Sequence, residues 1–298
     1  MIKKVFLILS IFILWHGLVE AGYDIVAVQS TRIPPYEDAI KGFRSICNFN
    51  IRRIIISEST SAEVVRKIRR IQPDLILAIG MDAFSVVKGI RDTSIVYLMV
   101  LNPQSLLSGE KNITGVSMNI PQRKQLLTLL KLLPHIKSIG LIYNPKNTGH
   151  LAERAKDAAK KAGVSLMATE IHSPKEVPSA LQKMKGRIDT FWMLPDYSVI
   201  TKETLEFLLL FSIESRIPIL TFSEKYVELG ALISIGIDSF DMGVQAGEMA
   251  KKILSGINVT GIQRVEARKL AISVNLKVAE KLEIRIDKNA MKGVKIID

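Results

Sequence analysis

The sequence predicts an α/β protein of two lobes, each built on a doubly wound parallel sheet. The same order of segments occurs twice, about 114 residues apart, with 25–29 corresponding to 139–143 and 74–79 to 189–194. Each copy reads strand, helix, strand, helix, strand, helix, strand. Two such copies predict a ligand-binding cleft between two lobes, because small molecules bind where doubly wound units leave a crevice.

The predicted strands are continuous apolar runs, which is typical of parallel strands buried on both faces. They are 25–28, 54–56, 75–79, 95–101, 139–143, 191–194 and 217–222. Helix-length segments lie between them. Segment 61–71 has Val64, Val65 and Ile68 on one face, and 151–162 has alanines at helical spacing. Strands and helices in this alternation form right-handed βαβ units.

The lobes are expected to be joined by a hinge of several crossing strands. A short strand at 112–117 leaves the first lobe, and Pro121 then opens an apolar helix. A second crossing precedes a helix of about 240–254, in which Gly243 and Gly247 share one face and favour close packing. The expected lobes are 22–117 plus 237–262 and 118–236 plus 263–298.

The N-terminus has the pattern of a secretory signal peptide, and residues 1–21 are expected to be removed on export. Lysines precede an apolar run at 5–15, which is shorter than a membrane span, and Val19 and Ala21 are small residues at the positions that signal peptidase reads. The mature protein is therefore expected in the periplasm or otherwise outside the cytoplasm. A retained membrane anchor is the alternative.

The formal net charge of +12 raises the question of nucleic acid binding. The basic residues are scattered over helix faces without interleaved aromatics, as at Arg66, Lys67, Arg69 and Arg70. We expect no nucleic acid partner and interpret these residues as a solvated face, with an anionic membrane or an acidic partner as alternatives. Cys47 is the only cysteine, so a buried core rather than an internal disulfide must stabilise the chain.

No catalytic or cofactor motif occurs in the sequence: it has no glycine-rich phosphate loop and no Gly-x-Ser-x-Gly elbow. The histidines after the signal segment, His135, His150 and His172, are widely spaced and form no metal-binding motif with two histidines. We therefore expect neither a metal nor another cofactor, and no enzymatic activity. An exported enzyme would need an acid, base or nucleophile from Asp82, His150, Asp196 or Glu224.

Ligands of doubly wound proteins bind at the carboxyl ends of the strands, and the loops there suit a small zwitterion with an apolar part. Arginine, serine and backbone N–H groups suit a carboxylate, an aspartate suits an ammonium, and aromatic rings suit an apolar side chain. Helix capping, solvation or core packing are the alternative roles of these residues. The candidates are Ser30, Arg32, Tyr36, Met81, Asp82, Asn102, Tyr143, Asn144, Asp196, Tyr197, Phe222 and Asp238.

Several segments together resemble one protein family. They are KSIGLIYNP at 137–145, IPI at 217–219, GALISIGID at 230–238 with Gly243 and Gly247, and NLKVA at 275–279. The sequence is similar here to substrate-binding proteins of ABC transporters with the type I periplasmic-binding fold, in the group that includes tryptophan- and tyrosine-binding members. The chain departs from the family pattern at Met81-Asp82 and Asn102-Pro103.

The resemblance implies two Rossmann-like lobes, capture of a small molecule such as an amino acid in the interlobe cleft, and delivery to an ABC permease in the inner membrane. Closure of the lobes on the ligand would bury it, and the protein is expected to act as a monomer. The alternative is a sensory binding protein that signals to a membrane receptor. A sugar-responsive repressor core shares the fold, but the signal segment and the lack of a DNA-binding headpiece argue against it.

Overall fold

The computed structural model describes residues 22–46 and 50–297, so the predicted signal segment at 1–21 lies outside the described residues. Contacts divide the chain into two compact units. Unit 1 consists of Met1–Val100, Leu106–Gly115 and Gly243–Gln263, and unit 2 of Leu101–Ser105, Val116–Met242 and Arg264–Asp298.

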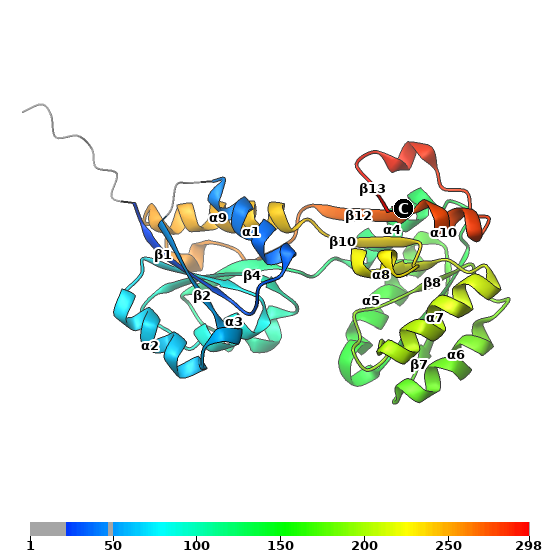
Figure 1. Cartoon of the computed structure of the whole chain (residues 1–298), viewed down its shortest axis with the longest axis horizontal. Helices are drawn as coiled ribbons and strands as arrows, with labels where there is room; N and C mark the ends of the chain where they lie inside the picture. The colour runs from blue at the N-terminus through cyan, green and yellow to red at the C-terminus, as the bar shows by residue number, and fades with distance from the viewer. Residues whose placement is uncertain (1–21, 47–49, 298) are drawn as a thin grey trace, which may run out of the picture. The chain divides into compact units, whose positions relative to one another are not determined.

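The first sheet has six strands in the order β11-β5-β4-β3-β1-β2, which makes β2 an edge strand. The pairs β1–β2, β1–β3 and β3–β4 are parallel. Figure 1 shows α2 and α3 on one side of this sheet and α1 and α9 on the other. The strands are β1 Asp24–Gln29, β2 Asn50–Ile55, β3 Leu75–Ile79, β4 Ser94–Val100, β5 Ile113–Ser117 and β11 Val265–Glu266. The helices are α1 Pro34–Arg44, α2 Ser61–Ile71, α3 Met81–Val87 and α9 Ser239–Leu254.

Local sequence explains where these helices begin and how closely they pack. Helix α2 begins at a capping box, in which Thr60 and Glu63 each hydrogen-bond the backbone N–H of the other. The predicted close contact at Gly243 is confirmed. A Cβ atom there would collide with the carbonyl oxygen of Ala39 in α1, and one on Gly247 would lie 3.0 Å from the carbonyl oxygen of Phe43. The two glycines therefore let α9 approach the backbone of α1.

The second sheet has seven strands in the order β13-β12-β10-β9-β8-β6-β7 and is parallel except where β10 and β12 pair antiparallel. Helices α4 and α5 pack on one face through Trp192 and Leu220, and α6 and α7 pack on the other through Phe191 and Ile219. The strands are β6 Ser138–Tyr143, β7 Ser165–Glu170, β8 Thr190–Trp192, β9 Ile219–Thr221, β10 Ile233–Ile237, β12 Leu270–Asn275 and β13 Lys295–Ile297. The helices are α4 Gln122–Leu132, α5 Pro145–Ala162, α6 Val177–Met184, α7 Lys202–Ser215, α8 Glu224–Glu228 and α10 Leu276–Lys281. Short 3₁₀ helices occur at Ile56–Glu58, Pro103–Leu106, Pro174–Glu176, Val259–Gly261 and Lys288–Met291.

The predicted α/β fold with two largely parallel sheets is confirmed, and the sheet orders show the internal repeat. Taken in chain order, the first five strands of each half lie in the spatial order 2-1-3-4-5, as β2-β1-β3-β4-β5 and as β7-β6-β8-β9-β10. Two differences from the sequence prediction are informative. Helix α5 begins at Pro145 rather than near residue 151, because Asn144 caps it, and β13 adds a strand that the sequence did not indicate.

Candidate functional site

In both units the strand order reverses beside the first strand of the repeat, between β1 and β3 and between β6 and β8. Ligands of doubly wound proteins bind outside the carboxyl ends of the strands at such a point. The reversal therefore selects the loops at 29–36 and 80–82 in unit 1 and at 143–148 and 195–198 in unit 2. Candidate residues occur in all four of these loops.

In unit 1, buried Ser30 joins the end of β1 to α3. Its Oγ accepts a hydrogen bond from the backbone N–H of Ala83 at 3.0 Å, and its own N–H donates to the carbonyl oxygen of Ile79 at 3.0 Å. The N-cap residue of α3 is Gly80, which has no side chain to cap the helix. Ser30 therefore supplies this cap from a different strand.

The hydroxyl of Tyr36 lies against Gly80 and Ser30. A Cβ atom on Gly80 would collide with that hydroxyl and would lie 2.6 Å from Ser30 Oγ. Burial raises the pKa of the Tyr36 phenol and the negative charge of Asp82 raises it further, while the hydrogen bond with Ser30 acts in the opposite direction. The phenol therefore stays protonated at neutral pH and can donate a hydrogen bond.

Met81 and Asp82 form the first turn of α3 and are exposed. Asp82 accepts no hydrogen bond from any residue within 22–46 or 50–297, so its carboxylate is accessible to a ligand. Met81 offers a flexible apolar side chain beside it. Ser30, Tyr36, Met81 and Asp82 are thus brought together at the strand-order reversal of unit 1.

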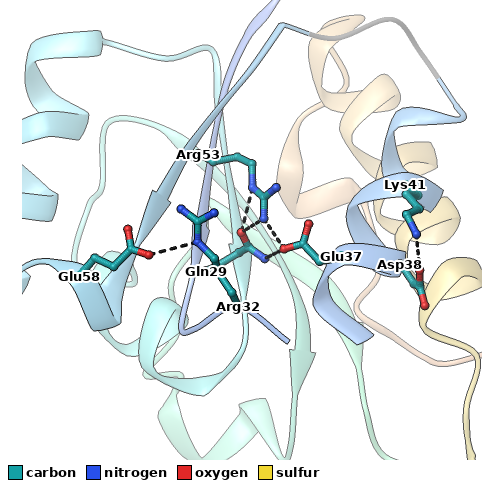
Figure 2. A network of polar contacts seen from close by, with 7 residues as sticks. All are labelled: Gln29, Arg32, Glu37, Asp38, Lys41, Arg53 and Glu58. Atoms are coloured by element: carbon teal, nitrogen blue, oxygen red, sulfur yellow. Dashed lines mark hydrogen bonds and ion pairs between the residues drawn. The ribbon is translucent and has the colours of Figure 1, made fainter. Parts of the chain in front are cut away.

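Arg32 has a different environment from the other unit 1 candidates. Its Nε lies 3.1 Å from Glu58 Oε1 (Figure 2). Its side chain also lines a hollow formed by β2 and α2. The guanidinium of Arg32 therefore already forms an ion pair with a carboxylate of the protein, and its binding to a ligand carboxylate stays a prediction.

In unit 2, Asp196 is at the centre of a network that joins the loop after β8 to the start of α5. Its Oδ2 accepts hydrogen bonds from the backbone N–H of Asn144 at 3.0 Å and from the hydroxyl of Thr148. Its Oδ1 accepts from the N–H and hydroxyl of Ser198 at 3.0 and 2.7 Å, and from the amide of Asn147 at 3.4 Å. The side chain is almost fully buried.

Burial by itself would raise the pKa of Asp196, but the hydrogen bonds from Thr148, Asn144 and Ser198 outweigh that effect and lower it. The group is an ionised carboxylate whose two oxygens are already bonded by the protein. The burial and the hydrogen bonds of Asp196 are therefore explained by a structural role, the tethering of two loops. Its binding to a ligand ammonium stays a prediction.

Around this network, two aromatic residues differ strongly in exposure. Tyr143 is nearly buried, with Lys156 Nζ 5.7 Å from its ring centre. Tyr197 is 80% exposed, and its hydroxyl donates to Asn147 Oδ1 at 3.1 Å. Asn144 caps α5 by accepting from the N–H of Lys146 at 3.0 Å. Tyr197 is thus the ring in this loop that a ligand can reach.

The remaining three candidates each have a structural contact. The N–H of Asn102, which has φ 47°, donates to Asn119 Oδ1 at 3.2 Å. The ring of Phe222 packs edge-on against Tyr226 with a centroid distance of 5.2 Å. Asp238 Oδ1 accepts from the backbone N–H of Asp241 at 2.9 Å and so caps α9.

The sequence analysis did not select Asn119, Asn147 or Thr148. Asn147 and Thr148 could have been recognised from the sequence, because a polar residue in the first turn of a helix after a parallel strand faces the loops that follow neighbouring strands. Asn119 is 17 residues from the Asn102 that it contacts, and no local pattern signals such a pairing.

Within the described part of the chain, no group of three or more His, Cys, Asp or Glu side chains has the geometry to hold a metal ion. The same residues include no helix that is both long and apolar enough to span a membrane.

Comparisons with known proteins identify the family. The family model for ABC transporter substrate binding protein matches residues 44–295. A tyrosine-binding protein of Clostridioides difficile (strain R20291) is 27% identical over 235 residues, which cover 76% of this chain and 68% of that protein.

Two solved structures share the fold. The ligand-free, open structure of a substrate-binding protein with adhesive properties from Clostridium difficile has a TM-score of 0.79 at 23% identity, covering 93% of this chain and 99% of that chain. An ABC domain from Streptococcus pneumonia in complex with L-Trp has a TM-score of 0.66 at 22% identity, covering 93% and 100%. Since the family model matches most of the sequence, the chain belongs to the ABC transporter substrate binding protein family.

Proposed function

We propose that this protein captures a small molecule, an amino acid or a similar zwitterion, outside the cytoplasm and delivers it to an ABC permease. The match of the substrate-binding family model over residues 44–295 carries the proposal. The polar and aromatic side chains at the strand-order reversals support it, because they offer complementary groups for both ends of a zwitterion.

In unit 1, Asp82 is the proposed acceptor for the ligand ammonium. Its carboxylate is exposed, whereas both oxygens of Asp196 are bonded by the protein. The protonated phenol of Tyr36 is the proposed hydrogen-bond donor to the ligand carboxylate, and Met81 the proposed apolar contact. Tyr36 is in the first turn of α1, and Met81 and Asp82 are in the first turn of α3. Both helix starts belong to a single unit, so the three side chains need no rearrangement of that unit to act together.

In unit 2, the exposed ring of Tyr197 is the proposed stacking partner for an apolar or aromatic side chain. Its hydroxyl is held by Asn147, which fixes one end of the ring. The names of the similar proteins, one tyrosine-binding and one in complex with L-Trp, make aromatic amino acids the first class to test. Such a protein acts by binding and release, without bond chemistry.

The test is a calorimetric titration of the mature protein, residues 22–298, with tyrosine, tryptophan and other amino acids, preceded by a thermal-shift screen. A ligand that binds only the native state raises the unfolding midpoint. Asp82→Asn should weaken binding by about tenfold or more, because a charge-assisted hydrogen bond is worth about 1.5–3 kcal/mol.

Asp92→Asn is the matched control, since Asp92 is also an exposed aspartate of unit 1 but precedes β4 rather than following a strand. Equal affinities of the two variants for the bound amino acid would remove Asp82 from the site. No binding of any amino acid would contradict the proposed ligand class.

A sensory binding protein is the second candidate function. Loss of amino acid uptake on deletion of the gene supports transport, whereas unchanged uptake with loss of a ligand-dependent response supports sensing. The proposed export is tested separately by N-terminal sequencing of the mature protein, where a start near Gly22 supports signal cleavage and an intact Met1 supports a retained anchor.

A further inference from the structure

A cationic hollow lies in unit 1, where the edge strand β2 meets α2. Its volume is about 560 Å³, which is within the range of small-molecule sites. Glu58 is the only acidic residue that lines it. The lining residues are Arg32, Arg52, Arg53, Ile54, Ile55, Glu58, Ser59, Lys67, Arg70 and Ile71.

Five of the lining side chains are cationic, and one of these, Arg53, is held by a network at the end of β1. Fully buried Gln29 accepts two hydrogen bonds from Arg53, from Nε at 3.0 Å and from Nη2 at 2.6 Å, and donates to Glu37 Oε1 at 3.3 Å (Figure 2). Arg53 also pairs with Glu37, and this contact lowers the pKa of the Glu37 carboxyl. The guanidinium of Arg53 is therefore fixed at one wall of the hollow.

Two further arginines of the lining form ion pairs with carboxylates. Arg32 pairs with Glu58 at 3.1 Å, and Arg52 lies 3.4 Å from Asp24 Oδ2. All four of these side chains are substantially exposed, so the pairs are weak and a ligand can compete for the arginines.

The other two cations form no ion pair with a carboxylate. Hydrogen bonds from Thr60 lower the pKa of the Glu63 carboxyl, and the charge of Lys67 only adds to that effect. Lys67 Nζ lies 3.4 Å from the hydroxyl of Ser59, and Arg70 has no hydrogen bond or ion pair to any of the residues that the structure describes. Lys67 and Arg70 are three residues apart on α2 and so project to the same side of the helix. The hollow therefore keeps two positive charges in excess after every ion pair is counted.

Protection of an exposed sheet edge explains part of this arrangement, because charged side chains on an edge strand oppose pairing with another chain. That role accounts for Arg52 and Arg53, which lie on β2. It does not account for Lys67 and Arg70, which lie on the helix and add charge to the same concavity.

The geometry points to binding of a phosphate-bearing anion in the cationic hollow. Four of its five cations are arginines, whose planar guanidinium matches the oxygens of a phosphate group in two parallel hydrogen bonds. Fixed Arg53 on one wall and the unpaired Lys67 and Arg70 on the other would contact the anion from two sides. The ligand is a free polyphosphate or the headgroup of an anionic lipid, which share this chemistry.

The test is calorimetric titration of residues 22–298 with inorganic pyrophosphate, and co-sedimentation with phosphatidylglycerol or phosphatidylcholine vesicles. Lys67→Gln/Arg70→Gln removes the two unpaired charges and should weaken binding by about tenfold or more. Arg66→Gln/Arg69→Gln is the matched control, because it removes the same charge from the same helix at residues that line a different hollow. Glu58→Gln should strengthen binding, since it frees Arg32 and removes the one acidic side chain from the lining.

Pyrophosphate binding that only the Lys67/Arg70 variant loses supports the proposal with a soluble ligand. Binding to phosphatidylglycerol but not phosphatidylcholine vesicles, with the same selective loss, supports it with a lipid headgroup. Equal losses in the two double variants would show a diffuse charge effect and overturn the proposal, as would the absence of binding to both probes. Circular dichroism checks that each variant keeps the helix content of the wild type.

Discussion

Replacement of Asp196 by alanine tests whether this carboxylate tethers the ligand-side loops of unit 2. The change removes both oxygens from the network and leaves the backbone N–H of Asn144 and the hydroxyl of Thr148 without their acceptor. Both of these residues are buried. The groups on Ser198 and Asn147 are less buried and can turn toward water.

The expected cost follows from the two buried donors. A buried donor left without an acceptor costs about 1–3 kcal/mol, and more where the lost partner was charged. Two such donors give a loss of about 4 kcal/mol in the free energy of unfolding. The sequence alone does not reveal this cost, because the two donors are 52 and 48 residues away from Asp196 in the chain.

The assay is urea denaturation of the wild type and the variant at pH 7, monitored by circular dichroism, with Asp157→Ala as the control. Asp157 is an exposed aspartate of α5 that pairs with Lys161, so its removal should cost less than about 1 kcal/mol. A loss below about 1 kcal/mol for Asp196→Ala would refute the tethering role.

The pH dependence gives a second check on the same variant. Because the pKa of Asp196 is lower in the folded protein than in the unfolded chain, its ionised form contributes stability at any pH above the unfolded value of about 3.9. That contribution is lost as the pH falls through the folded pKa. The stability difference between wild type and variant should therefore be constant near neutral pH and shrink in strong acid. A constant difference down to the lowest pH would contradict the lowered pKa.

Two glycine substitutions test the tight packing around α1 and the start of α3, where the unit 1 candidate residues lie. Gly80→Ala should destabilise unit 1 by about 2 kcal/mol or more, because φ is +91° and the new Cβ collides with the Tyr36 hydroxyl, and it should also weaken amino acid binding measured by calorimetry. Gly243→Ala should cost a similar amount in urea denaturation, since its Cβ meets the carbonyl oxygen of Ala39 in α1, the helix that also carries Tyr36. Gly89→Ala is the control for both, with open space around its Cβ, and a loss equal to that of the other two would refute the packing argument.

The fold was predictable from the sequence because it depends on short-range patterns. The apolar run at Leu75–Ile79 is a strand with the predicted bounds, and the helix at Ser61–Ile71 likewise, since burial on both faces and a capping box leave clear signals. The internal repeat, read from apolar runs about 114 residues apart, reappears as the same strand order in both sheets. Strand β13 was missed because it is a short, mostly exposed edge strand with a weak pattern.

The candidate loops were also predictable, because the rule that ligands bind at the carboxyl ends of parallel strands requires only the strand positions. What each side chain does within those loops was not. Asp82 and Asp196 are both aspartates just after a strand, yet one is exposed and the other is bonded by groups up to 52 residues away. Arg32 follows β1 but pairs with Glu58 beside the cationic hollow.

The sequence by itself thus determined the α/β class, the repeat and the family resemblance, since periodicity, capping and motif residues act over a few positions along the chain. Tertiary structure alone decided which carboxylate is free and which cations share a hollow. Charge pairing and burial depend on distances between segments that are far apart in the chain. Arg32, Arg53 and Arg70 come together only because β1, β2 and α2 fold against one another.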